Sequence, residues 1–532
     1  MDSYLEGKTA LVVDSNRDDL SNLRGLLGQL GLASVAAATS ANMAVSYLAA
    51  QSFDFCFVAY DLGLQAKNGL QVIQEATLDG SRRYRDCFVL IAGAEQAQVL
   101  AGALEYAPDA CLAKPFDMQR LRQCLDRLGQ VKTLLLPLEE CLDQRNWQGA
   151  LERGEQAQAQ YPGVRPYLQR LRGIALLHLQ RYREAEALFA ELAQERVCDW
   201  ADIGQGVALY HQGRYREARE CLAHLTGQNQ TVSEAFLMQA RCERVLGRWQ
   251  EAQMLLRKAT ILQPAMPQLQ ADLACLLALS GDWSQAATAY RGAVVHGRHS
   301  PFQRVDCYYG LVESLLQQVE QGVSPSSAAA EAECVRTLES AVRDFDGEPA
   351  VIFRSRLLAA RLYRRSGNTA MAEQAARYAF ERFAQLTVSE QAELADLLVD
   401  GLDSSSLAEA AQQKRQEAMR ALVSLDWGRS NLAAMLSYRK KEYEKAYDGF
   451  CEAERLRGGN PGVMLNLVQA GLEVARHQSP RAPDILRHCD ELLYGSQIGA
   501  LSQRQQERYR SLCQRLGDLN RARRGGGAET AV

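Results

Sequence analysis

Three charged side chains in the N-terminal part of the sequence could do chemistry together: Asp14, Asp61 and Lys114. Carboxylates and an ammonium group can form charge-assisted hydrogen bonds with one another or hold a charged group between them. Each of the three lies at or shortly after the end of a short apolar run. Whether they act together depends on whether the fold brings those ends to one place.

The apolar runs alternate with helical patterns, as in a parallel sheet with helices on both faces. The predicted strands are residues 9–13, 55–59, 88–92 and 110–112. The predicted helices are residues 18–30, 41–51, 69–78, 95–106 and 117–128. This pattern predicts a doubly wound α/β domain.

In a doubly wound sheet the functional crevice lies at the carboxyl ends of the strands. The residues that follow the predicted strands should therefore line one pocket. They are Asp14, Ser15, Ala59, Asp61, Gly93 and Lys114.

Four segments resemble the receiver domain of two-component response regulators. They are LVVDS at 11–15, FDFCFVAYDLG at 53–63, KNGLQVI at 67–73 and CLAKPFD at 111–117. The resemblance implies a flavodoxin-like fold over residues 1–130. It also implies a phosphorylation site made of an acidic pair that holds Mg²⁺, an acceptor aspartate on the third strand, a Ser or Thr and a Lys.

Several positions depart from that pattern. Asp14 keeps the first acid, but its neighbour is the neutral Ser15, which brings no charge to a hard cation. The acceptor position falls on Ala59, which cannot form an acyl phosphate, and the hydroxyl position falls on Gly93. Only Lys114 is retained. We therefore expect a pseudo-receiver with no phosphoacceptor and no cofactor.

A second alignment makes Asp61 the acceptor, because its spacing to Asn68 and Gly69 suits one. The protein would then be a phosphorylation-gated regulator, with Mg²⁺ held weakly at Asp14. Two structural interpretations stand beside both alignments. Asp14 could cap the first helix, and Lys114 could form a permanent ion pair with Asp14 or Asp61.

From about residue 135 a helical repeat replaces the α/β pattern. An aromatic residue followed three positions later by alanine recurs at intervals of 35, 33, 34 and 34 residues, at Trp147, Tyr182, Tyr215, Trp249 and Trp283. This is the period of tetratricopeptide (TPR) repeats, which form an all-α solenoid. We expect regular repeats over 131–300, degenerate repeats over 301–518 with a loop near 319–331, and a disordered tail over 519–532.

A solenoid of helix pairs exposes a concave groove that binds segments of other proteins. The repeat phase predicts a groove lined by Arg170, His178, Tyr210, His211, Arg241 and Arg244. The arginines would favour an acidic partner. The two histidines lack a third ligand in the same phase, so no metal site is expected.

Composition narrows the function further. The chain of 532 residues has a net charge of -4, which gives no basic field for nucleic acid. No long apolar stretch predicts a membrane span, so we expect a cytoplasmic protein. No catalytic motif is visible, so we do not expect an enzyme. The resemblance implies a sensor histidine kinase or a phosphotransfer protein as one partner. We expect a second protein partner in the groove, and a homodimer is a further expectation.

Overall fold

The computed structural model describes residues 5–63, 67–93, 104, 107–195, 199–228, 232–298, 300–320, 327–496 and 501–522. The chain divides into two compact units. The first extends to Cys242 and includes Lys258–Met266, and the second comprises Glu243–Arg257 and the chain from Pro267 onward.

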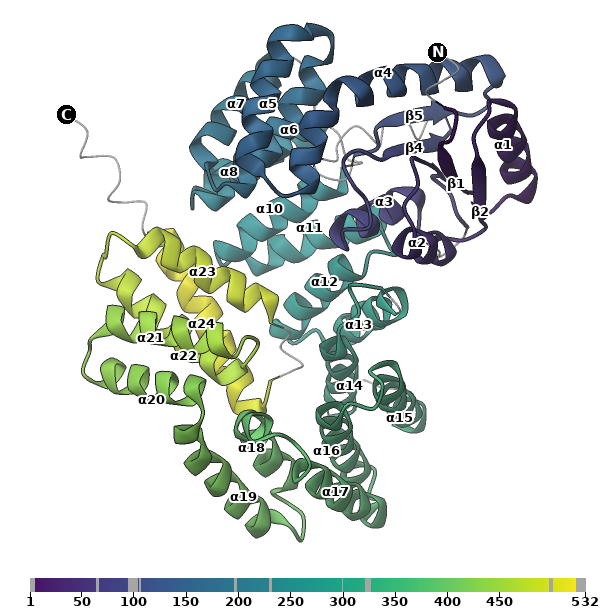
Figure 1. Ribbon diagram of the computed structural model, residues 1–532. Coiled ribbons are helices and arrows are strands. Elements are labelled where there is room, and N and C mark those ends of the chain that lie inside the picture. The colour runs from purple at the N-terminus through teal and green to yellow at the C-terminus, as the bar shows by residue number, and fades with distance from the viewer. Residues whose placement is uncertain are drawn as a thin grey trace, which may run out of the picture. The chain divides into compact units, whose positions relative to one another are not determined.

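The first unit begins with a parallel sheet of five strands (Figure 1). They are β1 (Thr9–Val13), β2 (Ser34–Ala38), β3 (Phe55–Ala59), β4 (Cys87–Ala92) and β5 (Ala110–Ala113). Their order is β2-β1-β3-β4-β5, which is the flavodoxin-like order. The predicted doubly wound fold is confirmed.

Strand β2 was absent from the sequence prediction. Its residues, SVAAA, are mostly alanine, which has a weak preference for strands, and only Ala38 is buried. The strand forms because it pairs with β1 along its whole length, from Thr9 opposite Ser34 to Val13 opposite Ala38.

Helices cover both faces of the sheet. On one face α2 (Ala41–Ala50) and α3 (Gly69–Leu78) pack on the side chains of alternate strand residues. On the other face α1 (Arg17–Gln29) and α4 (Met118–Asp143) pack on the remaining ones. The predicted helix at 95–106 lies outside the described residues, apart from residue 104.

Helix α4 belongs to both architectures. Its first half places Leu121, Leu125 and Leu128 in the core of the sheet domain. Its second half continues without interruption beyond residue 130 and packs against α5. The predicted boundary at 130/131 therefore falls inside a single 26-residue helix.

Helix pairs follow α4. Their bounds are α5 (Trp147–Gln160), α6 (Arg165–His178), α7 (Tyr182–Glu195), α8 (Asp199–His211), α9 (Tyr215–Gln228), α10 (Ser233–Val245), α11 (Trp249–Leu262), α12 (Pro267–Leu279), α13 (Trp283–Gly297), α14 (Val305–Glu320), α15 (Ser327–Asp344), α16 (Pro349–Arg365), α17 (Thr369–Phe383), α18 (Val388–Leu402), α19 (Ala408–Ala421), α20 (Asp426–Arg439), α21 (Tyr443–Leu456), α22 (Pro461–Arg476), α23 (Ala482–Gly495) and α24 (Gln503–Ala522). Helices α5, α7, α9, α11 and α13 each begin at one of the recurring aromatic residues, so the repeat and the all-α solenoid are confirmed.

Two predicted irregular segments are shorter than expected. Residues 327–331 of the predicted loop belong to α15, and 321–326 lie outside the described residues. Residues 519–522 of the predicted tail belong to α24, and the rest of that tail also lies outside the described part. No helix in the described part of the chain is long and apolar enough to cross a membrane.

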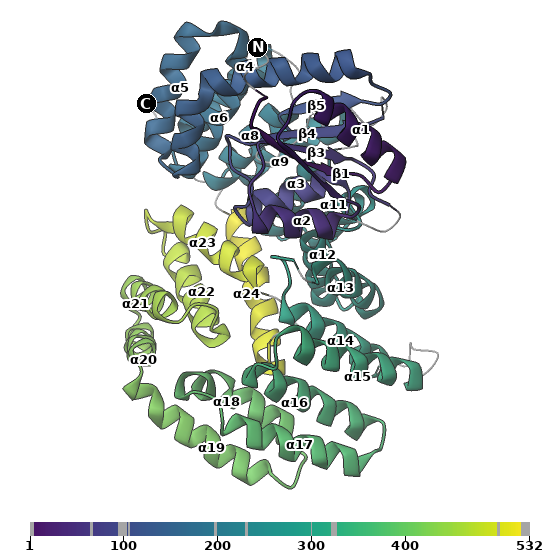
Figure 2. The same cartoon turned by 45° about the vertical axis from the view of Figure 1, so that its right-hand side comes forward.

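The second unit closes on itself through its last helix. Helix α24 packs against α22 and α23 (Figure 2). Its end also reaches the turn before α11. There Asn520 and Arg521 donate to the carbonyls of Val245 and Leu246, at 3.3 and 2.7 Å. A Cβ on Gly517 would lie 2.7 Å from the Cα of Gly247, so glycine permits this approach.

Candidate functional site

Three charged residues form an ion cluster at the carboxyl edge of the sheet. The Lys114 ammonium donates to Asp14 Oδ2 at 2.9 Å and to Asp19 Oδ2 at 2.7 Å. Asp14 is buried, while Asp19 lies on the first turns of α1. Burial alone would lower the pKa of Lys114, but its hydrogen bonds to the two carboxylates raise the pKa above its usual value. The predicted pair with Asp14 is present, and Asp19 is a member that the sequence analysis missed.

The cap of α1 is Asn16 and not Asp14. The Asn16 side chain accepts from the backbone amides of Asp18 and Asp19, while Asp14 Oδ1 accepts from the amide of Asn16 at 2.9 Å. The interpretation of Asp14 as a helix cap is therefore corrected. Asp14 supports the residue that caps the helix and binds Lys114 with its other oxygen.

Strand β3 ends in a methyl group. Ala59 is its last residue and is buried. The next residue, Tyr60, donates from its backbone to Ile91 at 2.7 Å and accepts from the Gly69 amide at 2.8 Å. A Cβ on Gly69 would lie 2.2 Å from the Ala59 carbonyl oxygen, so this glycine lets α3 begin against the strand end.

Asp61 lies outside the ion cluster. Its side chain is exposed, and its Oδ1 accepts from the backbone amide of Gly63 at 2.9 Å. In the described part of the loop, no hydrogen bond or ion pair joins Asp61 to Lys114. The alternative pair of Lys114 with Asp61 is not formed, and Asp61 instead stabilises a turn.

The side chains at this site are poor ligands for a divalent cation. Both oxygens of Asp14 already accept hydrogen bonds, and Lys114 supplies positive charge to Asp14 and Asp19. Ser15 is neutral and exposed, and Ala59 offers no oxygen in its side chain. Among the described residues no group of three or more His, Cys, Asp or Glu side chains could hold a metal ion.

Residues 10–126 match the family model of the response regulator receiver domain. This segment is a receiver domain. No curated protein matches the chain. A solved CheY-like receiver domain from Methylobacillus flagellatus is 20% identical, with 23% of this chain and 99% of that chain covered and a TM-score of 0.20.

Two solved repeat proteins are similar to longer parts of the chain. A tetratricopeptide repeat protein from Parabacteroides merdae is 13% identical, with 64% of this chain and 98% of that chain covered and a TM-score of 0.27. The C-terminal part of a TPR repeat-containing protein from Cytophaga hutchinsonii is 12% identical, with 50% and 98% covered and a TM-score of 0.38. The helix pairs that begin at the recurring aromatic residues follow the segment that matches the receiver-domain model.

A buried charge network joins the receiver domain to the first repeats. The Lys132 ammonium, on α4, lies 2.9 Å from Asp109 Oδ1 and 3.0 Å from Glu139 Oε1. Tyr167, on α6, donates its hydroxyl to Glu139 at 2.9 Å. Burial outweighs the attraction of Lys132 and raises the pKa of Glu139 to about 7. The network fixes α4 and α6 to the edge of the sheet domain.

Arg170 lies on α6 next to this charge network and is partly buried. Its guanidinium lies over the Tyr167 ring, 5.3 Å from the ring centroid. Burial lowers the pKa of Arg170 below its usual value. Arg170, which the sequence analysis placed in the groove, is half-buried and packs on a ring of its own helix.

The two histidines pack on the repeat aromatics. His178 stacks on Trp147 with centroids 4.0 Å apart, and His211 stacks on Tyr182 at 4.9 Å. The buried Tyr210 meets Tyr215 edge to face. His178 and His211 are equivalent in the repeat because each packs on the aromatic residue that begins the helix before it. The sequence analysis had instead predicted that they line the groove.

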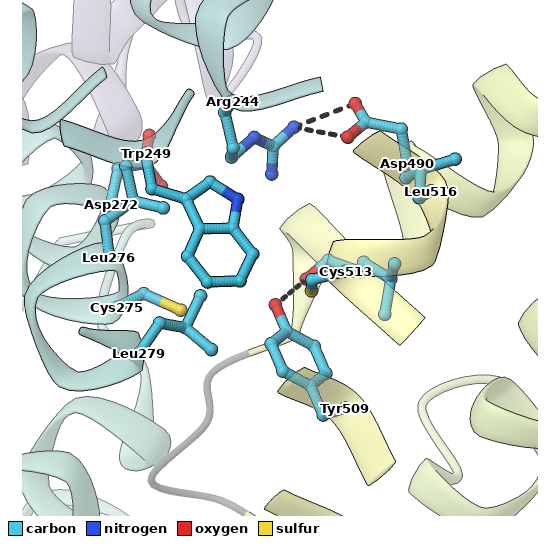
Figure 3. A pocket seen from close by; sticks show the side chains of 11 residues that line it. Arg244, Trp249, Asp272, Cys275, Leu276, Leu279, Asp490, Tyr509, Cys513 and Leu516 are labelled. Atoms are coloured by element: carbon cyan, nitrogen blue, oxygen red, sulfur yellow. Dashed lines mark hydrogen bonds and ion pairs between the residues drawn. The ribbon is translucent and has the colours of Figure 1, made fainter. Parts of the chain in front are cut away.

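Arg244 does meet an acid, but the acid belongs to its own chain. Arg244 Nη2 donates to Asp490 Oδ1 at 2.9 Å and Oδ2 at 2.8 Å (Figure 3). The pair borders a pocket lined by Trp249, Cys275 and Tyr509 among others. Arg241, three residues earlier on α10, is half-buried. The acidic partner expected for these arginines is thus supplied, for Arg244, by α23.

Proposed function

We propose that the protein is a signalling adaptor whose receiver domain works without phosphorylation. The ion cluster of Lys114 with Asp14 and Asp19 carries this proposal, together with the methyl side chain of Ala59 at the end of β3. A nucleophilic carboxylate is needed to form an acyl phosphate, and alanine offers none. The lysine has two carboxylates as partners before any phosphoryl group arrives.

The cluster supports a receiver domain held in one conformation. It ties the end of β1, the first turns of α1 and the end of β5 together through charge-assisted hydrogen bonds. The continuous helix α4 and the Lys132–Asp109–Glu139 network then fix this domain to the first repeats. The receiver surface would be presented constantly to a partner.

The partners fitting this function are proteins. The receiver domain would dock on a sensor histidine kinase or a phosphotransfer protein in the cytoplasm, and the repeats would hold a second protein. A non-enzymatic role follows, because docking alone would regulate the kinase. Self-association into a homodimer is compatible with the same surfaces.

Intact mass spectrometry of the full chain tests this function. The protein is incubated with acetyl phosphate and Mg²⁺, alongside the variants Asp61→Ala and Asp14→Ala. We expect no added phosphoryl group on any of the three proteins. A phosphoryl adduct that Asp61→Ala abolishes would contradict the proposal and make the protein a phosphorylation-gated regulator.

A further inference from the structure

Two buried carboxylates share one ammonium group where the receiver domain meets the first repeats. Lys132 Nζ lies 2.9 Å from Asp109 Oδ1 and 3.0 Å from Glu139 Oε1. The same ammonium donates to the Tyr84 carbonyl at 2.5 Å. All three charged side chains are almost fully buried. A single cation cannot neutralise both acids, so the other partners of each acid decide which of them holds a proton.

Asp109 has further partners and stays ionised. Arg82 Nη2 lies 3.3 Å from Asp109 Oδ2, and the backbone amide of Phe88 donates to the same oxygen at 2.8 Å. Burial alone would raise the pKa of Asp109, but Lys132, Arg82 and this amide lower the pKa below its usual value. The proton is therefore left to the second acid.

Glu139 has fewer partners than Asp109. Its Oε1 accepts from Lys132 at 3.0 Å and from the Tyr167 hydroxyl at 2.9 Å. Its Oε2 is buried and accepts no hydrogen bond from the described part of the chain. An ionised carboxylate with one bare buried oxygen is costly. Burial consequently outweighs the attraction of Lys132 and raises the pKa of Glu139 to about 7.

The other charged and titratable groups around Glu139 are engaged elsewhere. Arg170, on α6, lies over the Tyr167 ring at 5.3 Å from the ring centroid. Asp143, one turn further along α4, accepts from the Tyr84 amide at 2.6 Å. Burial raises the pKa of Cys87, on β4, far above its usual value, so this group stays a neutral thiol. Helix α5 also packs on α4, but its charged residues are exposed.

Tyr167 connects this titrating acid to the first repeats. Its hydroxyl donates to Glu139 on α4 and lies 3.4 Å from Asp109 Oδ1, in the segment before β5. Helix α4 is held to the sheet independently, because Leu121 and Leu125 lie in the core of the receiver domain. Water can therefore reach an ionised Glu139 when α6 moves away, while α4 stays in place.

We propose that the proton on Glu139 controls the docking of α6 on the receiver domain. The neutral carboxyl keeps Tyr167 in place, and the ionised carboxylate draws water to Oε2 and releases α6. A proton, and not a phosphoryl group, would then change how the receiver domain is presented beside the repeats. This consequence rests on the proposed adaptor function, whereas the docking itself can be measured on the chain alone.

Hydrogen–deuterium exchange of the full chain at pH 5, 6, 7 and 8 tests the proposal, with uptake corrected for the intrinsic dependence of exchange on pH. We expect opening of α6 to increase by about tenfold or more from pH 5 to pH 7 and to level off above pH 7. Below pH 4.5 the docked and released forms both hold the proton, and above pH 7 neither does, so release is favoured between these values. Strands β1 and β3 should keep their protection.

Glu139→Gln should remove the pH dependence of α6, and Glu140→Gln, at an exposed neighbouring position, should keep it. Tyr167→Phe is an independent test. The Tyr167 hydroxyl lowers the pKa of Glu139 by hydrogen bonding, so its loss should move the levelling-off to higher pH.

Three results would overturn the proposal. They are an opening of α6 that stays constant from pH 5 to pH 8, the same pH dependence in Glu139→Gln as in the unmodified chain, and an equal opening of β1 and β3. A phosphoryl adduct on the receiver domain would instead contradict the proposed function and leave this exchange result standing.

Discussion

Single residues decide whether the receiver domain can be a switch. Strand β3 ends in Ala59, whose side chain is a methyl group, and Lys114 bonds to Asp14 and Asp19. The same ion cluster stabilises the fold, because its loss would leave a partly buried charge without its partners. Function and stability are therefore linked at this site and can be tested separately.

Asp14→Ala should destabilise the receiver domain by about 1–2 kcal/mol, since Lys114 and the Asn16 amide each lose an acceptor. Asp61→Ala, the same chemical change at an exposed position, should cost about 0.5 kcal/mol or less. Urea unfolding of the two variants measures the difference. Equal costs would contradict the ion cluster as described.

Glu139 should make stability depend on pH near neutrality. Its folded pKa, raised by burial to about 7, exceeds the ordinary value of 4.5, so the folded state holds the proton more tightly. This contribution to stability is fully present below pH 4.5 and is lost as the pH rises through 7. Glu139→Gln should flatten the fall in melting temperature between pH 5 and pH 8, whereas Glu140→Gln, at an exposed neighbouring position, should not. An unchanged slope in Glu139→Gln would contradict the burial of a titrating carboxyl.

At the scale of elements, close packing of helices depends on some glycines inside them. Helix propensity alone would predict that alanine stabilises the protein at each of these positions. A Cβ on Gly173 of α6 would lie 2.2 Å from the Phe189 ring of α7. Gly173→Ala should therefore destabilise the first unit by about 1–3 kcal/mol through overpacking. Gly227→Ala in α9, where a Cβ would meet nothing within 4 Å, should stabilise it by about 0.5–1 kcal/mol. Thermal unfolding measures the change in melting temperature of each variant. A change of the same sign in both variants would contradict this explanation.

The elements also show which parts of the fold and of the site could be predicted from the sequence. Strongly apolar strands and the recurring aromatics predicted β3, β4 and the helix pairs, because those signals are local. The alanine-rich β2 was missed because its only support is pairing with β1. Asp19 was missed because its approach to Lys114 is a tertiary contact. The partners of two predicted groove residues could not be predicted for the same reason: Arg170 lies over the Tyr167 ring, and Arg244 donates to Asp490 of α23.

At the scale of the whole molecule, each unit is closed by charged contacts between distant parts of its sequence. In the second unit Asp490, almost fully buried, accepts from Arg244. Arg244→Ala should cost about 3 kcal/mol because it takes this partner from a buried carboxylate. Faster hydrogen exchange in α23 and α24 would report the loss, and Arg476→Ala, at an exposed arginine of α22, is the control. Unchanged exchange in Arg244→Ala would show that the pair does not hold the unit closed.

The central claim is that the receiver domain keeps one conformation without a phosphoryl group. Hydrogen–deuterium exchange of the full chain with and without beryllofluoride and Mg²⁺ tests it most directly. The account predicts the same deuterium uptake in peptides that cover 14–19, 55–63 and 110–120. Protection of these peptides by beryllofluoride, lost in Asp61→Ala, would contradict it and establish Asp61 as the acceptor of a working switch.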